Sequence, residues 1–417
     1  MGETLELAER ATGPLTGVRI IDLTTVVFGA YATQMLGDMG ADVIKIEQPT
    51  DAGDEGGDIL RWAGETPPGG PRDLGPIFMT LNRNKRSMLL DLRQPAALAA
   101  LHKLIATADV FVSCVRYDGL IRLGLSYEAV KAIRPDIVYV HGAGYDSAGP
   151  YAGLPAYDDL VQAGCGLADL LNRTDGDPAP RYLPVLLADK VSGMFMVQAV
   201  TAALFHRQRT GEGQFVETPM YECMTSFALA EHFFGQVYDP PTGPWGYGRV
   251  TNPQRKPFAT QDGHIGLLPY TDKQWDAFFD AAGLRDVAAD PRFADYQTRA
   301  RHIRELYALV EAVVRTRTTD EWLTLLEPRH VPVVRLNRLE DLQDDPQLKA
   351  VGLFERYEHP EAGAYTALRP PVKFSATPSN IRRHPPRLGE HTDALLAEAE
   401  GGSGGITSSS ADRGANS

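Results

Sequence analysis

The sequence contains few cysteines and no long apolar run, and both shortages narrow the class of protein. Its 417 residues include three cysteines, Cys114, Cys165 and Cys223, and these form no CxxC pair. Three widely spaced cysteines close one disulfide at most, which is typical of a reducing, intracellular compartment. No run reaches the roughly 18 apolar residues of a membrane span, and the N-terminal segment lacks the apolar core of a signal peptide. We therefore expect a cytoplasmic protein with no membrane partner.

Basic residues are also in short supply. Lys and Arg total 41 against 54 Asp and Glu, so the formal net charge is −13 at pH 7. Such a chain does not attract nucleic-acid phosphates by bulk charge, and we expect no nucleic-acid partner. An anionic ligand must instead meet a local group of cations. The segment 82–86, Asn-Arg-Asn-Lys-Arg, is one such group, although most charge runs are solvated faces.

The common catalytic motifs are missing as well. The turn after the first predicted strand, residues 24–32, holds the single glycine Gly29, whereas a dinucleotide fold needs several glycines there. No GxSxG elbow, HExxH pair, Walker loop or cysteine cluster occurs, and the ten histidines show no paired spacing for a metal. We therefore expect neither a nicotinamide or flavin dehydrogenase, nor a serine hydrolase, nor a metal enzyme.

The first 150 residues contain a regular alternation of strand and helix patterns. Apolar runs rich in Val and Ile are separated by amphipathic stretches long enough for right-handed crossovers. The runs predicted as strands are residues 17–24, 41–47, 87–93, 109–115 and 136–144. This alternation predicts an α/β fold with a doubly wound parallel sheet.

The pattern changes after residue 150. Two long helices are predicted over 156–171 and 189–209, the second stopped by Gly211, and a third over 217–238. A hairpin at 257–270 and further helices predict a smaller α+β domain.

A second hairpin, residues 352–374, is expected to return the chain to the first domain. We therefore place the first part of a large α/β domain at 1–222, a smaller domain at 223–340, the return to the large domain at 341–400, and a disordered Gly/Ser-rich tail at 401–417.

Two acidic positions begin predicted helices. Asp189 follows PVLLA and precedes an apolar helix, and Asp158 follows Tyr157 at the start of the helix before it. A carboxylate at a helix N-terminus is favoured by the helix dipole and by free backbone N–H groups, so capping is the simplest role. Catalysis is the alternative, and these residues alone do not decide between the two.

Six sequence blocks point to a known family. They are GVRIIDLTTVVFGAYATQMLGDMGADVIKIEQP, LNRNKRSMLLDL, PAYDDLVQAGCGL, ADKVSGMF, RTGEGQFVE and LGEHTDALL. In this order, from Pro14 to Leu396, they resemble the class III coenzyme A transferases, the family of formyl-CoA transferase and carnitine CoA-transferase, to which α-methylacyl-CoA racemase is related. The resemblance implies a Rossmann-like large domain built from both chain ends, a smaller domain between them, and an interlocked homodimer.

The resemblance also implies a reaction. It assigns Asp189 as the nucleophile that forms an acyl-aspartyl anhydride and then an aspartyl-CoA thioester, with Asp158 as an assisting carboxylate. The expected partners are an acyl-CoA and a small carboxylic acid, and the only cofactor is CoA as substrate and carrier. Tyr157, a poor base near neutral pH, stands where racemases place the histidine of a His-Asp pair. Racemization is the runner-up, because a different base could be recruited. A non-catalytic CoA-binding protein is the third alternative.

Binding residues follow from the same resemblance. It places Val26 beside the adenine or pantetheine of CoA, and Lys85 and Arg122 near its phosphates, while Arg83 and Arg86 are added by charge alone.

A glycine-containing loop over the substrate corresponds to residues 243–249, with Trp245, Gly246, Tyr247 and Gly248 as candidate contacts. The acids stay unidentified at this point. Dicarboxylates held by Arg249 or Arg255 are one alternative, and those arginines as surface groups are the other.

Overall fold

The computed structural model describes residues 4–49, 55–175 and 177–401. Except for Gly401, the predicted tail lies outside the described residues. The chain divides into two compact units, each described by itself below. The first comprises Met1–Gln162, Pro184–Met224 and Gly352–Ser417, and the second comprises Ala163–Leu183 and Thr225–Val351.

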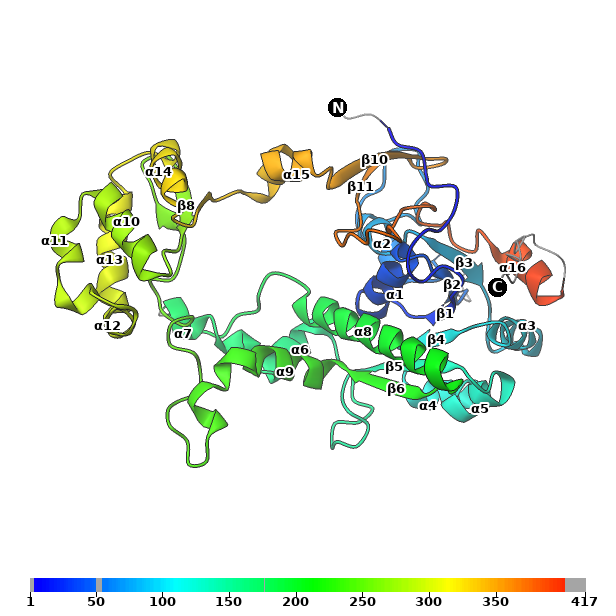
Figure 1. Cartoon of the computed structure of the whole chain (residues 1–417). Helices are drawn as coiled ribbons and strands as arrows, with labels where there is room; N and C mark the ends of the chain where they lie inside the picture. Colours follow the sequence, from blue (N-terminus) through cyan, green and yellow to red (C-terminus); the bar gives the residue numbers. More distant parts are fainter. Residues whose placement is uncertain (1–3, 50–54, 176, 402–417) are drawn as a thin grey trace, which may run out of the picture. The chain divides into compact units, whose positions relative to one another are not determined.

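The first unit is built on a six-stranded parallel sheet (Figure 1). The strands are β1 (Arg19–Leu23), β2 (Asp42–Glu47), β3 (Lys85–Leu89), β4 (Val110–Ser113), β5 (Val138–Ala143) and β6 (Phe215–Pro219). Their order is β3-β2-β1-β4-β5-β6, so the direction of winding reverses between β1 and β4. Ligands of open α/β sheets bind outside the carboxyl ends of the strands at such a reversal. The predicted α/β class with a parallel sheet is confirmed.

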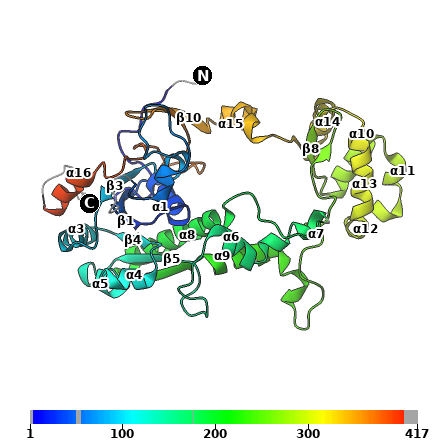
Figure 2. The ribbon, with the colours of Figure 1, turned by 180° about the vertical axis from the view of Figure 1, so that it is seen from behind.

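Helices cover both faces of this sheet (Figures 1 and 2). One face carries α3 (Pro95–Ile105), α4 (Tyr117–Arg122), α5 (Tyr127–Ile133) and α16 (Thr392–Ala399). The other carries α1 (Phe28–Asp38) and α8 (Leu187–Thr210). Leu395 of α16 is fully buried in the same core cluster as Ile21 of β1 and Leu104 of α3. Both ends of the described chain therefore build one unit.

A two-stranded antiparallel sheet completes the first unit. Strands β10 (Phe354–His359) and β11 (Gly363–Leu368) pair from Phe354↔Leu368 to His359↔Gly363. The hairpin predicted over 352–374 is thus confirmed.

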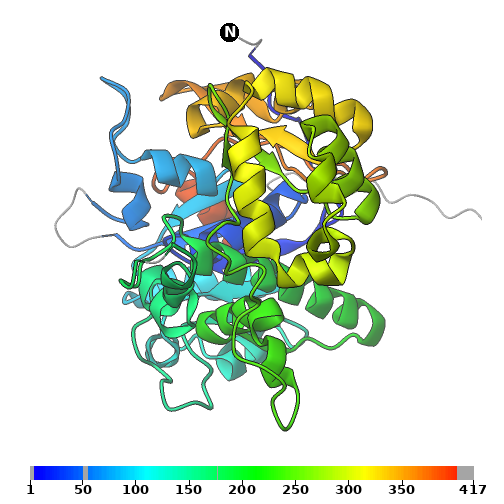
Figure 3. The same ribbon diagram turned by 90° about the vertical axis from the view of Figure 1, so that its left-hand side faces the viewer.

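The second unit packs helices around a small three-stranded sheet; its helices are the yellow-green and yellow ribbons of Figure 3. The strands are β7 (Phe258–Ala259), β8 (His264–Leu267) and β9 (Val333–Arg335), and the helices that pack on them are α10 (Asp272–Ala282), α13 (Ile303–Val314) and α14 (Thr319–Leu326). Their apolar faces meet in a core that includes Trp275, Phe278 and Trp322. The predicted hairpin and helices of this segment are confirmed.

The remaining α-helices of the described residues range from four to 13 residues in length. They are α2 (Pro76–Leu81), α6 (Asp158–Gly164), α7 (Asn172–Asp175), α9 (Met220–His232), α11 (Arg285–Ala288), α12 (Tyr296–Arg301) and α15 (Pro346–Ala350). None of the helices among these described residues combines the length and apolarity needed to span a bilayer.

Two predicted helices differ from the structure. The helix expected over 156–171 stops at Gly164, because Gly166 takes the left-handed conformation with φ of +85° and the chain turns there. The helix expected from residue 217 begins at Met220 instead, because Phe215–Pro219 forms the edge strand β6 beside β5. A five-residue strand that ends at a proline shows too little alternation to be recognised in the sequence.

Candidate functional site

The candidate site begins at the first turn of α8, where Asp189 is the third helical residue. Two glycines let this turn approach the carboxyl ends of the strands. A Cβ on Gly193 would come within 2.9 Å of the Phe28 carbonyl oxygen in α1, and a Cβ on Gly142 within 2.7 Å of Cys114 Sγ after β4. The turn therefore lies close to the reversal point of the sheet.

Asp158, the first residue of α6, lies beside Asp189. The Oδ1 atom of Asp158 accepts the backbone N–H of Asp189 at 3.2 Å, and its Oδ2 atom accepts the side-chain N–H of Gln162 at 2.6 Å. The N-cap residue of α8, Leu186, makes no side-chain cap. Asp158 therefore supplies from another helix the acceptor that the start of α8 needs. The two acidic residues singled out in the sequence are brought together.

The electrostatic setting of Asp189 is unusual for a carboxylate. Its side chain is buried, with 7% of the residue exposed, and within the described part of the chain it has neither a hydrogen-bond donor nor a counter-ion. Burial, followed by the negative charges of Asp158 and Asp159, raises the pKa of Asp189 to about 7. Because the carboxylate itself accepts no helix N–H, capping does not explain its position. A desolvated, unpaired carboxylate is instead typical of a nucleophile or base.

Cys114 directly follows β4, and its thiol feels the charge of Asp189. Burial, together with the charges of Asp22 and Asp189, raises the pKa of Cys114. The thiol therefore stays protonated near neutral pH and does not compete with Asp189 as a nucleophile.

Val26 occupies the turn between β1 and α1 and has a strained backbone. Its φ of +63° lies in the left-handed region, which a β-branched residue rarely adopts and which costs on the order of 1–3 kcal/mol. The backbone N–H of Val26 donates to both carboxylate oxygens of Asp58 at 3.1 Å. Backbone strain of this kind is common where ligands bind.

Lys85, predicted near a phosphate, is fully buried on β3. Its Nζ donates to the Ala30 carbonyl at 3.0 Å and to the Asn82 side chain at 2.9 Å, and it lies 3.3 Å from an oxygen of Asp22. Burial lowers the pKa of Lys85 to about 8, and the charge of Asp22 opposes this shift. A phosphate could reach this ammonium only if these contacts opened.

The two neighbouring arginines are also engaged by their own chain. Arg83 pairs with Asp38 at 2.6 Å, and Arg86 pairs with Asp42 at 2.6 Å and with Glu398 at 2.5 Å. Both arginines are buried. The basic segment therefore balances acidic groups inside the first unit, including one on the C-terminal helix.

Arg122 has different surroundings. It is the last residue of α4, and its side chain is exposed. The structure therefore separates Arg122, which solvent reaches, from the three buried cations of the basic segment.

The loop residues Trp245, Gly246, Tyr247 and Gly248 belong to the second unit. The backbone N–H groups of Gly246 and Tyr247 donate to the carbonyl oxygen and Nδ1 of His232 at 2.8 and 3.3 Å. Trp245 and Gly246 also line a cavity of about 130 Å³ beside His232. His232 is not recognisable in the sequence, because a lone histidine at a helix end carries no motif.

Arg249, the last residue of this loop, is surrounded by tyrosines. Its guanidinium lies 4.9 Å from the ring centre of Tyr270. Although its partial burial alone would lower the pKa of Arg249, hydrogen bonds and charge interactions with Tyr247 and Tyr307 raise it. Among the described residues, no carboxylate forms an ion pair with Arg249. Arg255, in contrast, is an exposed surface group.

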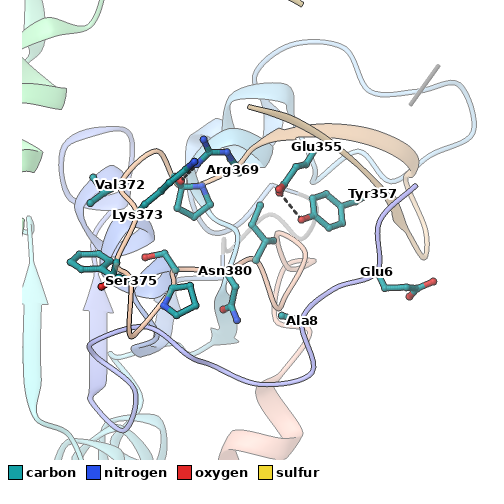
Figure 4. Close-up of a pocket in the computed structure, with 14 residues that line it drawn as sticks. Glu6, Ala8, Glu355, Tyr357, Arg369, Val372, Lys373, Ser375 and Asn380 are labelled. Carbon is teal, nitrogen blue, oxygen red and sulfur yellow. Dashed lines mark hydrogen bonds between the residues drawn. The ribbon is translucent and has the colours of Figure 1, made fainter. Parts of the chain in front are cut away.

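A larger cavity of about 500 Å³ lies elsewhere in the first unit (Figure 4). It is bordered by the β10–β11 hairpin, the segment 369–381 and the N-terminal strand-like segment near Glu6. Glu355 accepts a hydrogen bond from Tyr357 on its wall, at 2.8 Å. Neither Asp158 nor Asp189 lines it, so it is distinct from the carboxylate pair.

Comparison with known proteins gives the family. A model of CoA-transferase family III matches residues 15–392, which is nearly the whole chain. The chain belongs to CoA-transferase family III. It is therefore an enzyme of the CoA-transferase class, which acts on acyl-CoA and carboxylic acids with CoA as substrate and carrier.

Relatives within family III have similar lengths. Succinate–glutarate CoA-transferase of Agrobacterium fabrum is 32% identical over 93% of this chain and 96% of its own. Succinyl-CoA:mesaconate CoA-transferase of Haloarcula hispanica is 31% identical over 94% of this chain and 98% of its own. The crystal structure of a CAIB/BAIF family protein from Brucella suis covers 93% of this chain and 100% of its own, with 30% identity and a TM-score of 0.77. The predicted family resemblance is confirmed.

Proposed function

We propose that this enzyme moves CoA from an acyl-CoA donor to a carboxylic acid through covalent intermediates on Asp189. The observation that carries the proposal is the carboxylate of Asp189, which is buried and unpaired beside Asp158 at the ligand-binding edge of the sheet. Transfer without hydrolysis needs an intermediate that keeps the energy of the thioester, and an anhydride does so.

The steps balance without any further reactant. An oxygen of Asp189 attacks the donor carbonyl and the CoA thiolate leaves, which gives an acyl-aspartyl anhydride. The thiolate then attacks the aspartyl carbonyl and releases the donor acid as its carboxylate. The acceptor carboxylate attacks the aspartyl-CoA thioester and expels the CoA thiolate, which leaves an anhydride between the acceptor and Asp189. The thiolate then attacks the acceptor's carbonyl, which gives the new acyl-CoA and restores the carboxylate of Asp189.

Asp158 supports these steps in two ways. Its hydrogen bond to the backbone N–H of Asp189 fixes the turn that carries the nucleophile. Its charge contributes to the raised pKa of Asp189, which increases the basicity and hence the nucleophilicity of the ionised carboxylate.

We further propose that the acceptor is a small dicarboxylate. The relatives named above carry succinate, glutarate and mesaconate in their names. Arg249 supports the proposal because it is a partly buried cation whose described neighbours are tyrosines rather than carboxylates. A carboxylate is a suitable partner for such a group.

We propose CoA contacts from the family resemblance. Val26 and Arg122 are the candidates whose surroundings agree best, since one lies at the sheet reversal and the other is exposed. A phosphate of CoA reaches Lys85, Arg83 or Arg86 only in a state in which their ion pairs are open. The interlocked homodimer and the cytoplasmic location are likewise proposals, and sedimentation of the purified protein tests the first.

A single experiment tests the function. Purified enzyme is incubated with succinyl-CoA and isotopically labelled glutarate, and the thioesters are identified by mass spectrometry. We expect label in glutaryl-CoA with wild type and none with Asp189→Asn. Exchange of the α-proton in heavy water without acid exchange would instead indicate racemization, for which Tyr157 offers a poor base.

A further inference from the structure

The turn between β1 and α1 is held by two buried carboxylates that the proposed chemistry does not use. Asp22 accepts the backbone N–H of Thr24 at 2.9 Å and its hydroxyl at 2.5 Å. Asp58 accepts the backbone N–H of Val26 through both oxygens at 3.1 Å. Alternate residues of the turn are therefore fixed by separate carboxylates.

Lys45, on β2, connects the Thr24 side of the turn to Asp58. Its Nζ donates to the Thr24 carbonyl at 2.7 Å and to Asp58 at 3.0 Å, and the Lys45 and Asp58 side chains are both fully buried. Burial alone would lower the pKa of Lys45, but the charges of Asp58 and Asp22 raise it, so the ammonium stays charged. Asp58 is itself positioned by Glu47, which accepts its backbone N–H at 3.0 Å.

These contacts act on a residue that does not favour its own conformation. Val26 has φ of +63°, where glycine is the usual residue and a branched side chain is strained. Without the hydrogen bond to Asp58, the strain would move Val26 toward negative φ. The turn lies where the winding of the sheet reverses, so its shape defines one wall of the ligand-binding edge.

We propose that Lys45 and Asp58 are positioning residues that impose the left-handed conformation on Val26 and thereby shape the turn against which CoA binds. This inference rests on the proposed function, since it uses Val26 as a CoA contact. The pair touches neither Asp158 nor Asp189, so its effect falls on CoA affinity rather than on the chemical steps.

The test measures CoA binding by calorimetry on the full chain, together with KM and kcat for the donor. Asp58→Asn should raise the Kd for CoA and the KM for the donor about tenfold, and change kcat by less than about threefold. The matched control is Asp73→Asn. Asp73 is also buried and accepts a backbone N–H, from Leu388 at 2.7 Å, and it pairs with two cations, Arg387 at 2.6 Å and Arg61 at 3.8 Å. None of these three partners belongs to the turn. The Kd of the Asp73→Asn protein for CoA should stay within about twofold of the wild-type value.

A second substitution separates positioning from general destabilisation. Glycine adopts positive φ without strain, so the turn of a Val26→Gly protein depends less on the Lys45–Asp58 pair. In the Val26→Gly background, Asp58→Asn should therefore raise the Kd by less than about twofold. The proposal is overturned if Asp58→Asn weakens CoA binding no more than Asp73→Asn, or weakens it equally in both backgrounds.

The result that would overturn the proposed function differs from the result that would overturn the positioning role of Lys45 and Asp58. Calorimetry of CoA binding does not require anhydride chemistry, whereas the proposed function fails if Asp189→Asn still transfers CoA. The two outcomes are read from different variants and different instruments.

Discussion

Asp189 has the surroundings of a reactive group rather than of a structural one. Buried carboxylates are normally paired or hydrogen-bonded, because leaving one unpaired costs free energy. Here burial, followed by the negative charges of Asp158 and Asp159, which add to the cost, raises the pKa of Asp189 to about 7. A fold that maintains this arrangement gives up stability for a carboxylate with the pKa of a catalytic base or nucleophile.

The raised pKa predicts a pH dependence. Only the ionised form of Asp189 attacks, so kcat/KM for the donor should rise about tenfold per pH unit below about pH 7 and level off above about pH 8. Initial rates in buffers of constant ionic strength give the profile. A flat profile from about pH 5 to 8 would show that the nucleophile has an ordinary carboxylate pKa.

At the same scale, Arg249 is predicted to select dicarboxylates. Arg249→Met keeps most of the apolar length of the side chain and removes its charge, so the KM for a dicarboxylate acceptor should rise about 10- to 100-fold. The KM for a monocarboxylate acceptor should change by less than about threefold. Arg255→Met is the control, since Arg255 is exposed. Equal effects on both acceptors would remove Arg249 from acceptor recognition.

At the scale of elements, the central feature is the contact between the first turns of α6 and α8. Asp158 on α6 provides both a hydrogen bond and a negative charge to the first turn of α8. These two contributions are separable, because asparagine keeps the acceptor oxygen and loses the charge.

Asp158→Asn should therefore move the midpoint of the pH–rate profile to lower pH, because one of the charges that raise the pKa of Asp189 is gone. Asp158→Ala should show the same displacement and, in addition, lose about 1 kcal/mol of stability with the missing cap. Thermal unfolding at pH 8 measures the second effect. An unmoved midpoint in Asp158→Asn would mean that the charge of Asp158 does not contribute to the raised pKa of Asp189.

Buried strands are the elements that the sequence predicts best. The Val- and Ile-rich runs predicted five parallel strands, because fully buried strands are continuous and apolar. The edge strand β6 was missed because its five residues carry no comparable signal. The left-handed glycine Gly166, which ends the helix after Asp158, was likewise not distinguishable from a tolerated helical glycine.

The candidate site was less predictable from local pattern than the fold. Asp189 looked like a capping residue, and only the order of six family blocks favoured a nucleophile. Lys85 looked like an accessible cation, whereas the structure buries it against Asp22. Pairings of this kind join residues that are 63 positions apart in sequence (residues 22 and 85), so no local pattern reveals them.

At the scale of the whole molecule, the first unit depends on both ends of the described chain. The helix α16 contributes Leu395 to the main core, and its Glu398 pairs with Arg86 on β3. The C-terminal segment is therefore part of the same packed unit as the parallel sheet and Asp189.

Leu395→Ala should accordingly lower the free energy of unfolding of the first unit by about 2–4 kcal/mol, because it opens a cavity in a closed core. Leu396→Ala is the control, since Leu396 is only partly buried and should cost less. Urea unfolding followed by circular dichroism gives both values. Equal losses would indicate that α16 is not docked as described.

The central claim, that Asp189 carries the acyl group and then CoA covalently, is tested most directly by trapping. Wild-type enzyme and Asp189→Asn are each treated with hydroxylamine in the presence and absence of an acyl-CoA, and their peptides are analysed by mass spectrometry. The account predicts a hydroxamate on the peptide containing Asp189, formed only in wild type and only with acyl-CoA, in parallel with loss of activity. Continued transfer without that modification, or transfer by Asp189→Asn at the wild-type rate, would contradict it.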